Sequence, residues 1–325
     1  MDSRLLLGTA PDSWGVWFAD DPAQVPWHRF LDEAADAGYR WIELGPYGYL
    51  PTDPARLRDE LDARGLRLSG GTVFAGLHRG AEALEQAVRD CRTEAALLTA
   101  LGARHLVLLP EGYTDLDGSR TQPAELTAAQ WRELTTGMST LARTLHDEFD
   151  VRLVFHPHAD SHVDTQPRVE RFLTDTDPGH VRLCLDTGHI SYCGGDNIEI
   201  IRRFPERIGY VHLKQVDPAV LREVIAEGLA FAPAVARGVM VEPPRGVPEI
   251  PPLLDELRAL DVDLFAVVEQ DLYPCERDVP FPIATRTASY LGGCGLGPVR
   301  REPAHSPTHA SGRHPAGCEM RGTAQ

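Results

Sequence analysis

Eight short apolar segments, separated by longer amphipathic stretches, constrain the fold of this chain more than any other feature. The stretch at 81–101 is typical of those between the segments, because Leu84, Val88, Cys91 and Ala95 recur at helical spacings of three and four residues. Strands that alternate with helices pair in parallel and are joined by right-handed crossovers. The predicted strands are Leu5–Leu7, Trp41–Leu44, Leu66–Ser69, His105–Leu109, Arg152–Phe155, Val181–Leu185, Ile208–Leu213 and Leu264–Val268.

An open doubly wound sheet and a closed barrel would both satisfy this alternation. No G-x-G-x-x-G motif follows the first strand, which removes the main signature of a dinucleotide-binding sheet, and eight units in one chain favour closure. We therefore predict an α/β fold, a single-domain (β/α)8 TIM barrel, at residues 1–291. The segment 292–325 is rich in glycine, proline, serine and histidine without hydrophobic periodicity, and we predict that it is a disordered tail.

The composition excludes several classes of partner. The net charge is −16, from 48 acidic and 32 basic residues, which opposes binding to nucleic acid and to anionic membrane surfaces. No apolar run approaches the roughly 18 residues of a membrane span. The six cysteines are scattered without a C-x-x-C pair, so we expect reduced thiols and a cytoplasmic protein. The expected partner is a small-molecule polyol or keto-sugar, and homo-oligomerisation is left open.

Metal-ligating side chains stand at the ends of four consecutive predicted strands: His156, Asp186, His212 and Glu269. Barrel strand ends converge on one mouth, so residues far apart in the sequence can meet there. Imidazole and carboxylate are ligands of first-row divalent metals, and a buried carboxylate is costly unless it is paired or metal-bound. Each residue also has a structural alternative, such as turn formation for Asp186 or an ion pair for Glu269, but all four alternatives would have to hold independently. We predict one divalent metal ion at the mouth.

The order of these residues resembles the metal-site motifs of the xylose-isomerase-like sugar-phosphate isomerase/epimerase superfamily. The motifs are DTGH at 186–189, HLK at 212–214 and the strand-end Glu269, and the resemblance spans about residues 5–291. Within the superfamily, four longer stretches are similar to the inosose (2-keto-myo-inositol) dehydratases. They are APDSWGVW at 10–17, HPHADSHVDT at 156–165, DTGHISYCGGD at 186–196 and YVHLKQV at 210–216.

This resemblance implies a metal-dependent dehydratase, a lyase that eliminates water from a keto-inositol such as 2-keto-myo-inositol to give a cyclic dione. It places metal ligands at Asp186, His212 and Glu269. The fourth ligand of the family, a glutamate after the fifth strand, falls on His156, and His158 could substitute for it. Mn²⁺ or Co²⁺ is the metal expected first, while Mg²⁺, Fe²⁺ and Zn²⁺ also suit these ligands.

The chemistry needs a base and an acid beside the metal. A Lewis-acidic metal would stabilise the enediolate that forms when a proton leaves the carbon next to the keto group. Glu269 and Glu43 are the candidate bases, with His156 behind them. Lys214 or His189 would protonate the departing hydroxyl group.

Residues near the first strand are candidates for holding the sugar ring. Trp14 and Trp17 follow that strand and could wall the pocket, or could be ordinary core residues. Asp12 and His158 would hydrogen-bond the substrate. The same set would serve a ketose or keto-inositol isomerase or epimerase, and a non-catalytic sugar-binding barrel is a further alternative. An endonuclease IV-like phosphodiesterase is disfavoured by the negative charge and by the absence of metal ligands at the end of the third strand, SGGTVF.

Overall fold

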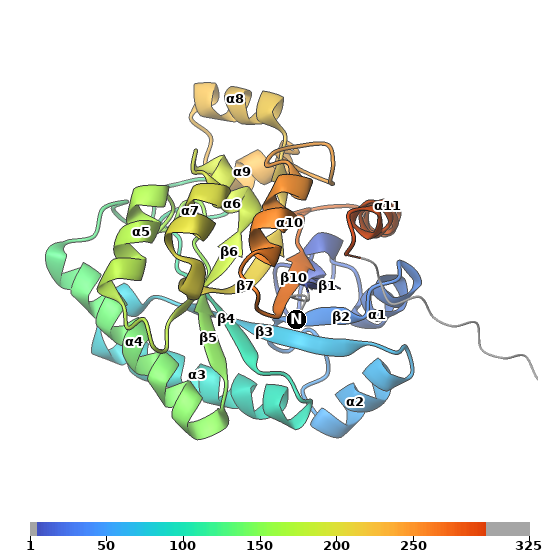
Figure 1. The fold of residues 1–325 in the computed structure, drawn as a ribbon, viewed down its shortest axis with the longest axis horizontal. Coiled ribbons are helices and arrows are strands. Elements are labelled where there is room, and N and C mark those ends of the chain that lie inside the picture. Colours follow the sequence, from blue (N-terminus) through green and yellow to red (C-terminus); the bar gives the residue numbers. More distant parts are fainter. Residues whose placement is uncertain (1–4, 297–325) are drawn as a thin grey trace, which may run out of the picture.

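A closed barrel of eight parallel strands forms the centre of the computed structural model, which describes residues 5–296 (Figure 1). The order around the barrel is β1-β10-β7-β6-β5-β4-β3-β2. The predicted fold class is therefore confirmed. The strands are β1 (Leu5–Thr9), β2 (Trp41–Pro46), β3 (Arg67–Ala75), β4 (His105–Pro110), β5 (Arg152–Phe155), β6 (Arg182–Asp186), β7 (Ile208–Leu213) and β10 (Leu264–Val268).

Helices surround the barrel, and their ends follow local sequence signals. Thr127 caps the helix α4 (Ala128–Phe149): its Oγ1 accepts the N–H of Gln130, while the Gln130 side chain accepts the N–H of Thr127. No helix within residues 5–296 combines the length and the apolar character that crossing a membrane requires. The outer helices are α1 (Trp27–Asp36), α2 (Pro54–Asp62), α3 (Ala81–Ala100), α4 (Ala128–Phe149), α5 (Gln166–Asp175), α6 (Thr187–Tyr192), α7 (Asn197–Arg203), α10 (Ile250–Arg258) and α11 (Pro280–Gly293).

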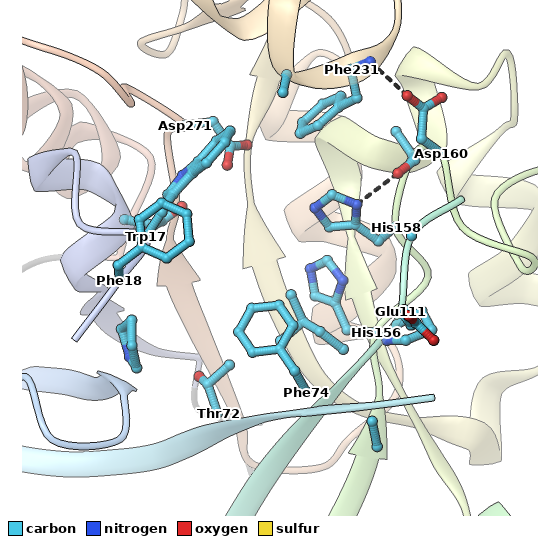
Figure 2. Close-up of a pocket in the computed structure, with 18 of the residues that line it drawn as sticks. Trp17, Phe18, Thr72, Phe74, Glu111, His156, His158, Asp160, Phe231 and Asp271 are labelled. Atoms are coloured by element: carbon cyan, nitrogen blue, oxygen red, sulfur yellow. Dashed lines mark hydrogen bonds between the residues drawn. The ribbon is translucent and has the colours of Figure 1, made fainter. Parts of the chain in front are cut away.

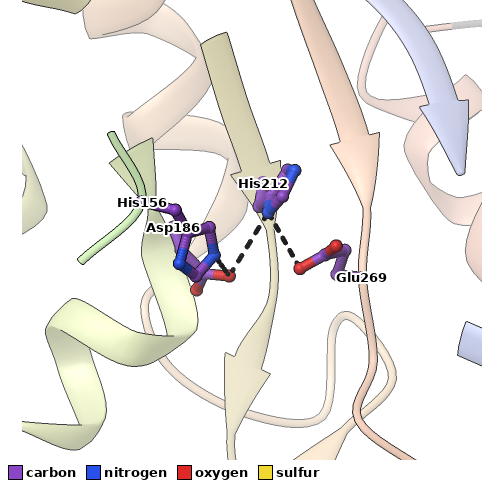
Figure 3. Close-up of side chains that lie close together, drawn as sticks. All are labelled: His156, Asp186, His212 and Glu269. Atoms are coloured by element: carbon purple, nitrogen blue, oxygen red, sulfur yellow. Dashed lines mark hydrogen bonds and ion pairs between the residues drawn. The ribbon is translucent and has the colours of Figure 1, made fainter. Parts of the chain in front are cut away.

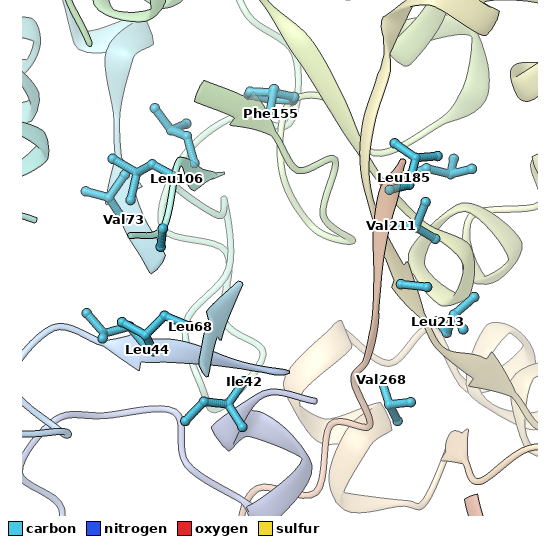
Figure 4. Packing of buried hydrophobic residues seen from close by; sticks show 14 of the residues in the cluster. Ile42, Leu44, Leu68, Val73, Leu106, Phe155, Leu185, Val211, Leu213 and Val268 are labelled. Atoms are coloured by element: carbon cyan, nitrogen blue, oxygen red, sulfur yellow. The ribbon is translucent and has the colours of Figure 1, made fainter. Parts of the chain in front are cut away.

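Two apolar layers hold the barrel together. Alternate residues of a strand point to opposite faces, so Leu106 and Leu108 of β4 join the large cluster between strands and helices, which Figure 4 shows in part. Val107 belongs instead to a smaller cluster with Val154 and Tyr210, which fills the barrel interior. Side chains of the described residues therefore pack the barrel interior.

Strand β3 is longer than predicted. The predicted strand ends at Ser69, but β3 continues through Gly70 and Gly71 to Ala75. A Cβ atom at Gly71 would overlap the Glu94 carboxylate of α3, so this glycine permits close packing of helix on strand and forms no turn. Glu94 is 2% exposed and accepts the N–H of Thr72 at 2.7 Å.

The buried Glu94 is expected to make stability depend on pH. Burial raises its pKa to about 8, whereas in an unfolded chain the value is about 4.3. Between these pH values the unfolded chain is ionised and the folded chain is protonated, so stability falls as pH rises, by up to about 1.4 kcal/mol per pH unit, and levels off above the folded pKa. Glu94→Gln is neutral at every pH. Its free energy of unfolding should therefore exceed that of the parent by about 2–4 kcal/mol at about pH 9, and should be similar to that of the parent at about pH 5.

Urea unfolding of both proteins at the two pH values measures this difference. Glu85→Gln is the matched control, because Glu85 lies on the exposed side of the same helix. Parallel pH profiles for the parent and Glu94→Gln would contradict the expectation.

The connection between β7 and β10 contains an unpredicted small subdomain. It consists of β8 (Gln215–Val216), α8 (Pro218–Glu227), α9 (Phe231–Ala236) and β9 (Met240–Val241), and β8 pairs with β9 in antiparallel fashion. Its helices project beyond one end of the barrel (Figure 1) and share their own apolar cluster.

The last helix, α11, runs past the predicted limit of the barrel at residue 291. It ends at Gly293, and Leu296 beyond it packs into the main core with 3% exposure, so ordered structure extends past the predicted limit at 291. The remainder of the predicted tail, 297–325, lies outside the described residues.

Candidate metal centre

The register of the barrel brings the four predicted ligands together. Asp186 ends β6 and is the register partner of His212 on β7. His156 follows β5, and its N–H donates to Leu108 O at 2.9 Å. Glu269 follows β10. Each residue offers one ligand atom, and these atoms all lie within 4.8 Å of one another (Figure 3).

The atoms that face one another in this group suit a cation. Nδ1 of His212 lies 2.8 Å from Glu269 Oε2 and 3.8 Å from Asp186 Oδ2, and Nε2 of His156 lies 3.2 Å from the same Asp186 oxygen. The His212 Nδ1 atom is buried and no hydrogen bond to it is found among the described residues, although Glu269 Oε2 lies 2.8 Å away. An orphaned ring nitrogen that faces two carboxylates fits a first-row divalent metal.

Local folding explains the DTGH sequence. Asp186 caps α6, because its Oδ1 accepts the N–H of His189 at 2.8 Å, and this leaves Oδ2 to face the ligand group. Thr187 Oγ1 exchanges hydrogen bonds with the backbone of Lys214. Only glycine at position 188 lets the α6 backbone approach the Lys214 side chain this closely, because a Cβ there would lie 2.5 Å from that side chain.

Glu43 contacts the ligand group from the opposite side of the barrel. Its Oε1 lies 2.7 Å from His212 Nε2, its Oε2 accepts a hydrogen bond from Thr72, and it is 1% exposed. When a carboxylate accepts the N–H of one ring nitrogen of a histidine, it fixes the tautomer and orientation of that ring. Here Glu43 holds Nε2 of His212, so Nδ1 is left to face a metal. This geometry does not support the expectation that Glu43 acts as a base, because His212 and Thr72 occupy both of its oxygens.

A buried ammonium group lies beside the ligands. Lys214 Nζ is 3.2 Å from oxygens of both Asp186 and Glu269, 2.8 Å from Asp271 Oδ2 and 4.0 Å from Asp12 Oδ2. Burial lowers the pKa of Lys214, but the surrounding carboxylates outweigh burial and hold the pKa well above its usual value. Lys214 is therefore held in its charged ammonium form at neutral pH.

The same charges act on the carboxylates. Burial raises the pKa of Glu269, but His212 and Lys214 more than compensate and lower it to about 2. Asp271 has no role in the sequence prediction, and the structure pairs it with Lys214. The signal was its position two residues after Glu269, since alternate residues share one face of an extended segment.

Two further histidines pack against this lysine. His189 Nε2 lies 3.3 Å from Lys214 Nζ, and the rings of His158 and His189 are 4.0 Å apart. Burial lowers the pKa of His158 to about 4 and that of His189 well below its usual value, with neighbouring positive groups adding to both shifts. The predicted role of His189 as an acid is disfavoured, because a neutral imidazole donates a proton much less readily than the adjacent ammonium.

A cavity of about 760 Å³ opens above these residues and contains most of the predicted substrate contacts (Figure 2). Asp12, Trp17 and His158 line it, and Trp17 stacks on Tyr273 with ring centroids 5.0 Å apart. Trp14 does not line it, contrary to prediction. The short 3-10 helix η1 (Pro11–Trp14) leaves that indole fully buried, where its Nε1–H donates to Glu33 at 2.8 Å.

Three aromatic residues of the cavity were missed by the sequence analysis: Phe18, Phe74 and Phe231. Phe74 lies in the unpredicted part of β3, and Phe231 begins α9 of the inserted subdomain. Neither position follows a predicted strand end, so the strand-end rule had no signal for them.

A closed (β/α)8 barrel with a buried histidine–carboxylate group at the strand ends defines a metal-centre barrel of the kind that acts on small molecules. The chain belongs to the xylose isomerase-like TIM barrel family, whose model matches residues 31–281. It is 31% identical over 297 residues to the inosose dehydratase of Geobacillus kaustophilus (strain HTA426), covering 88% of this chain and 93% of that protein. It is 32% identical over 267 residues to the rhizopine catabolism protein MocC of Rhizobium meliloti, covering 80% of each.

Solved structures agree on the fold. The crystal structure of the IolI protein, which contains a bound zinc atom, matches with a TM-score of 0.68 at 14% sequence identity. The match covers 90% of this chain and 98% of that one. At this identity the likeness supports the barrel architecture alone.

Proposed function

We propose that the protein is a divalent-metal-dependent lyase that eliminates water from a keto-inositol such as 2-keto-myo-inositol. The observation that carries the proposal is the Lys214 ammonium, 3.2 Å from both Asp186 and Glu269, because it puts a proton donor directly beside the ligand group. The similarity to inosose dehydratases over most of the chain supports the substrate class.

In this proposal His156, Asp186, His212 and Glu269 hold the metal. When bound, the ion supplies Lewis-acid polarisation of the keto group. Two carboxylates and two imidazoles balance a dication and suit Mn²⁺ or Co²⁺, and the same ligand types also suit Zn²⁺. His156 is the weakest ligand of the set, because its second nitrogen, Nδ1, is buried without a hydrogen-bond partner in the described part of the chain.

The side chains divide the proton transfers between them. Glu269, held ionised by Lys214 and His212, takes the proton from the carbon next to the keto group. Lys214 gives a proton to the hydroxyl group that leaves as water. The neutral His189 ring positions the ammonium, while Asp12 and Asp271 accept hydrogen bonds from ring hydroxyl groups.

Incubation of the metal-loaded protein with 2-keto-myo-inositol tests this function. We expect growth of dione absorbance with Mn²⁺ or Co²⁺, and none after chelation. A shifted ketone without loss of water would instead establish an isomerase or epimerase at the same site. Binding of the ketone without any conversion would support a non-catalytic sugar-binding barrel and contradict the lyase.

A further inference from the structure

The cavity is much larger than the ring that the proposed function places in it. Its volume of about 760 Å³ lies in the upper part of the range for pockets that enclose drug-sized ligands. A monocyclic keto-inositol held at the metal centre fills only the inner part, next to His156, Lys214 and Glu269. The outer part of the same cavity remains available to a substituent on the ring.

Aromatic and aliphatic side chains line this outer part. Phe74, Phe18 and Leu116 are 59%, 38% and 51% exposed, and all three line this one cavity. Figure 2 shows Trp17 and Phe18 on one side of the cavity, Phe74 across from them, and Phe231 closer to His158. Exposed apolar side chains gathered around one opening are typical of a binding surface.

Two of these rings are held in place by specific contacts. Trp17 stacks on Tyr273, with an angle of 23° between the planes. The backbone N–H of Phe231 donates to Asp160 Oδ2 at 2.7 Å, and the same oxygen accepts a hydrogen bond from Thr114. The outer part is therefore organised before any ligand arrives, which reduces the entropy lost on binding.

The charges of the cavity disfavour an anionic substituent. Among the described residues that line it, the cationic side chains are Arg79 and Lys214. Arg79 forms a two-pronged pair with Glu111, at 2.6 and 2.5 Å, and Lys214 is surrounded by carboxylates. A phosphate or carboxylate in the outer part would meet no unpaired cation and would face Asp90 and Asp115.

We propose that the outer part of the cavity is a subsite for an uncharged apolar substituent on the substrate ring, such as an aryl or alkyl ether. This rests on the proposed function for the position of the ring. The substituent is assigned to the substrate, not to a second protein chain, because the apolar residues and the metal ligands line one continuous cavity.

Calorimetry on the Mn²⁺-loaded protein tests the subsite without turnover. The probes are myo-inositol and a mono-O-benzyl ether of myo-inositol, which lack the keto group. Burial of the phenyl ring should lower Kd by about tenfold or more. Phe74→Ala should abolish most of this preference, whereas Tyr47→Ala should keep it, because Tyr47 is 40% exposed but does not line the cavity.

Three results would overturn the subsite: equal Kd values for the two probes, a benzyl preference that survives in Phe74→Ala, or dissociation of an oligomer by Phe74→Ala, since a second chain would then cover the rim. The corresponding ketones separate this inference from the proposed function. A benzyl preference without turnover of either ketone would contradict the lyase and support the subsite. Turnover without the benzyl preference would support the lyase and contradict the subsite.

Discussion

Replacement of Asp186 by alanine is expected to remove the metal from the purified protein and to lower turnover by at least about a thousandfold. Its Oδ2 atom faces His156, His212 and Lys214, so the substitution removes an oxygen from the centre of the group. Metal analysis should give about one equivalent per chain for the parent and almost none for the variant. Asp186→Asn should show the same loss while keeping an oxygen to cap α6, which separates metal binding from folding of that helix.

Two variants calibrate this measurement. Glu43→Ala removes only the carboxylate that orients His212, so metal affinity should fall by about 10–100-fold without disappearing. His146→Ala should change nothing. That histidine belongs to a second, more exposed group with Asp147 and His180, which could hold a metal adventitiously. A full equivalent of metal in Asp186→Ala would refute the ligand set.

The proximity of the four candidate ligands was predictable from the sequence, because barrel geometry supplies the missing information. Parallel strands in register carry their C-terminal residues to one mouth. The proximity of Asp186, His212 and Glu269 could therefore be predicted without knowing how the loops fold. The role of Glu43 was not predictable in this way. It depends on which nitrogen of His212 faces which carboxylate, and that follows from side-chain geometry across the barrel.

The pocket wall was less predictable than the metal centre. Trp14 and Trp17 are three residues apart in the chain, but η1 places the first in the core and the second in the cavity. The inserted subdomain escaped detection because β8 and β9 have only two residues each, too few to show an alternating pattern. Its contribution to the cavity, Phe231, was missed for the same reason.

Replacement of Lys214 by glutamine is expected to stop elimination while leaving proton abstraction intact. In our proposal Glu269 removes the proton and Lys214 only protonates the leaving hydroxyl, so dione formation should fall by about 10²–10⁴-fold. In deuterated water the variant should still exchange the hydrogen next to the keto group, as followed by NMR of the substrate. Glu269→Gln is the matched comparison, and it should lose both exchange and elimination.

Metal content decides how these rates are interpreted. Lys214 offsets part of the negative charge of Asp186, Glu269 and Asp271, and its loss leaves three closely spaced carboxylates that repel one another unless the metal is present. Loading with metal should therefore raise the unfolding temperature of Lys214→Gln more than that of the parent. If the loaded variant loses exchange and elimination equally, Lys214 orients the metal centre and is not the acid. If elimination survives, the proton comes from another group, and the assignment to Lys214 is wrong.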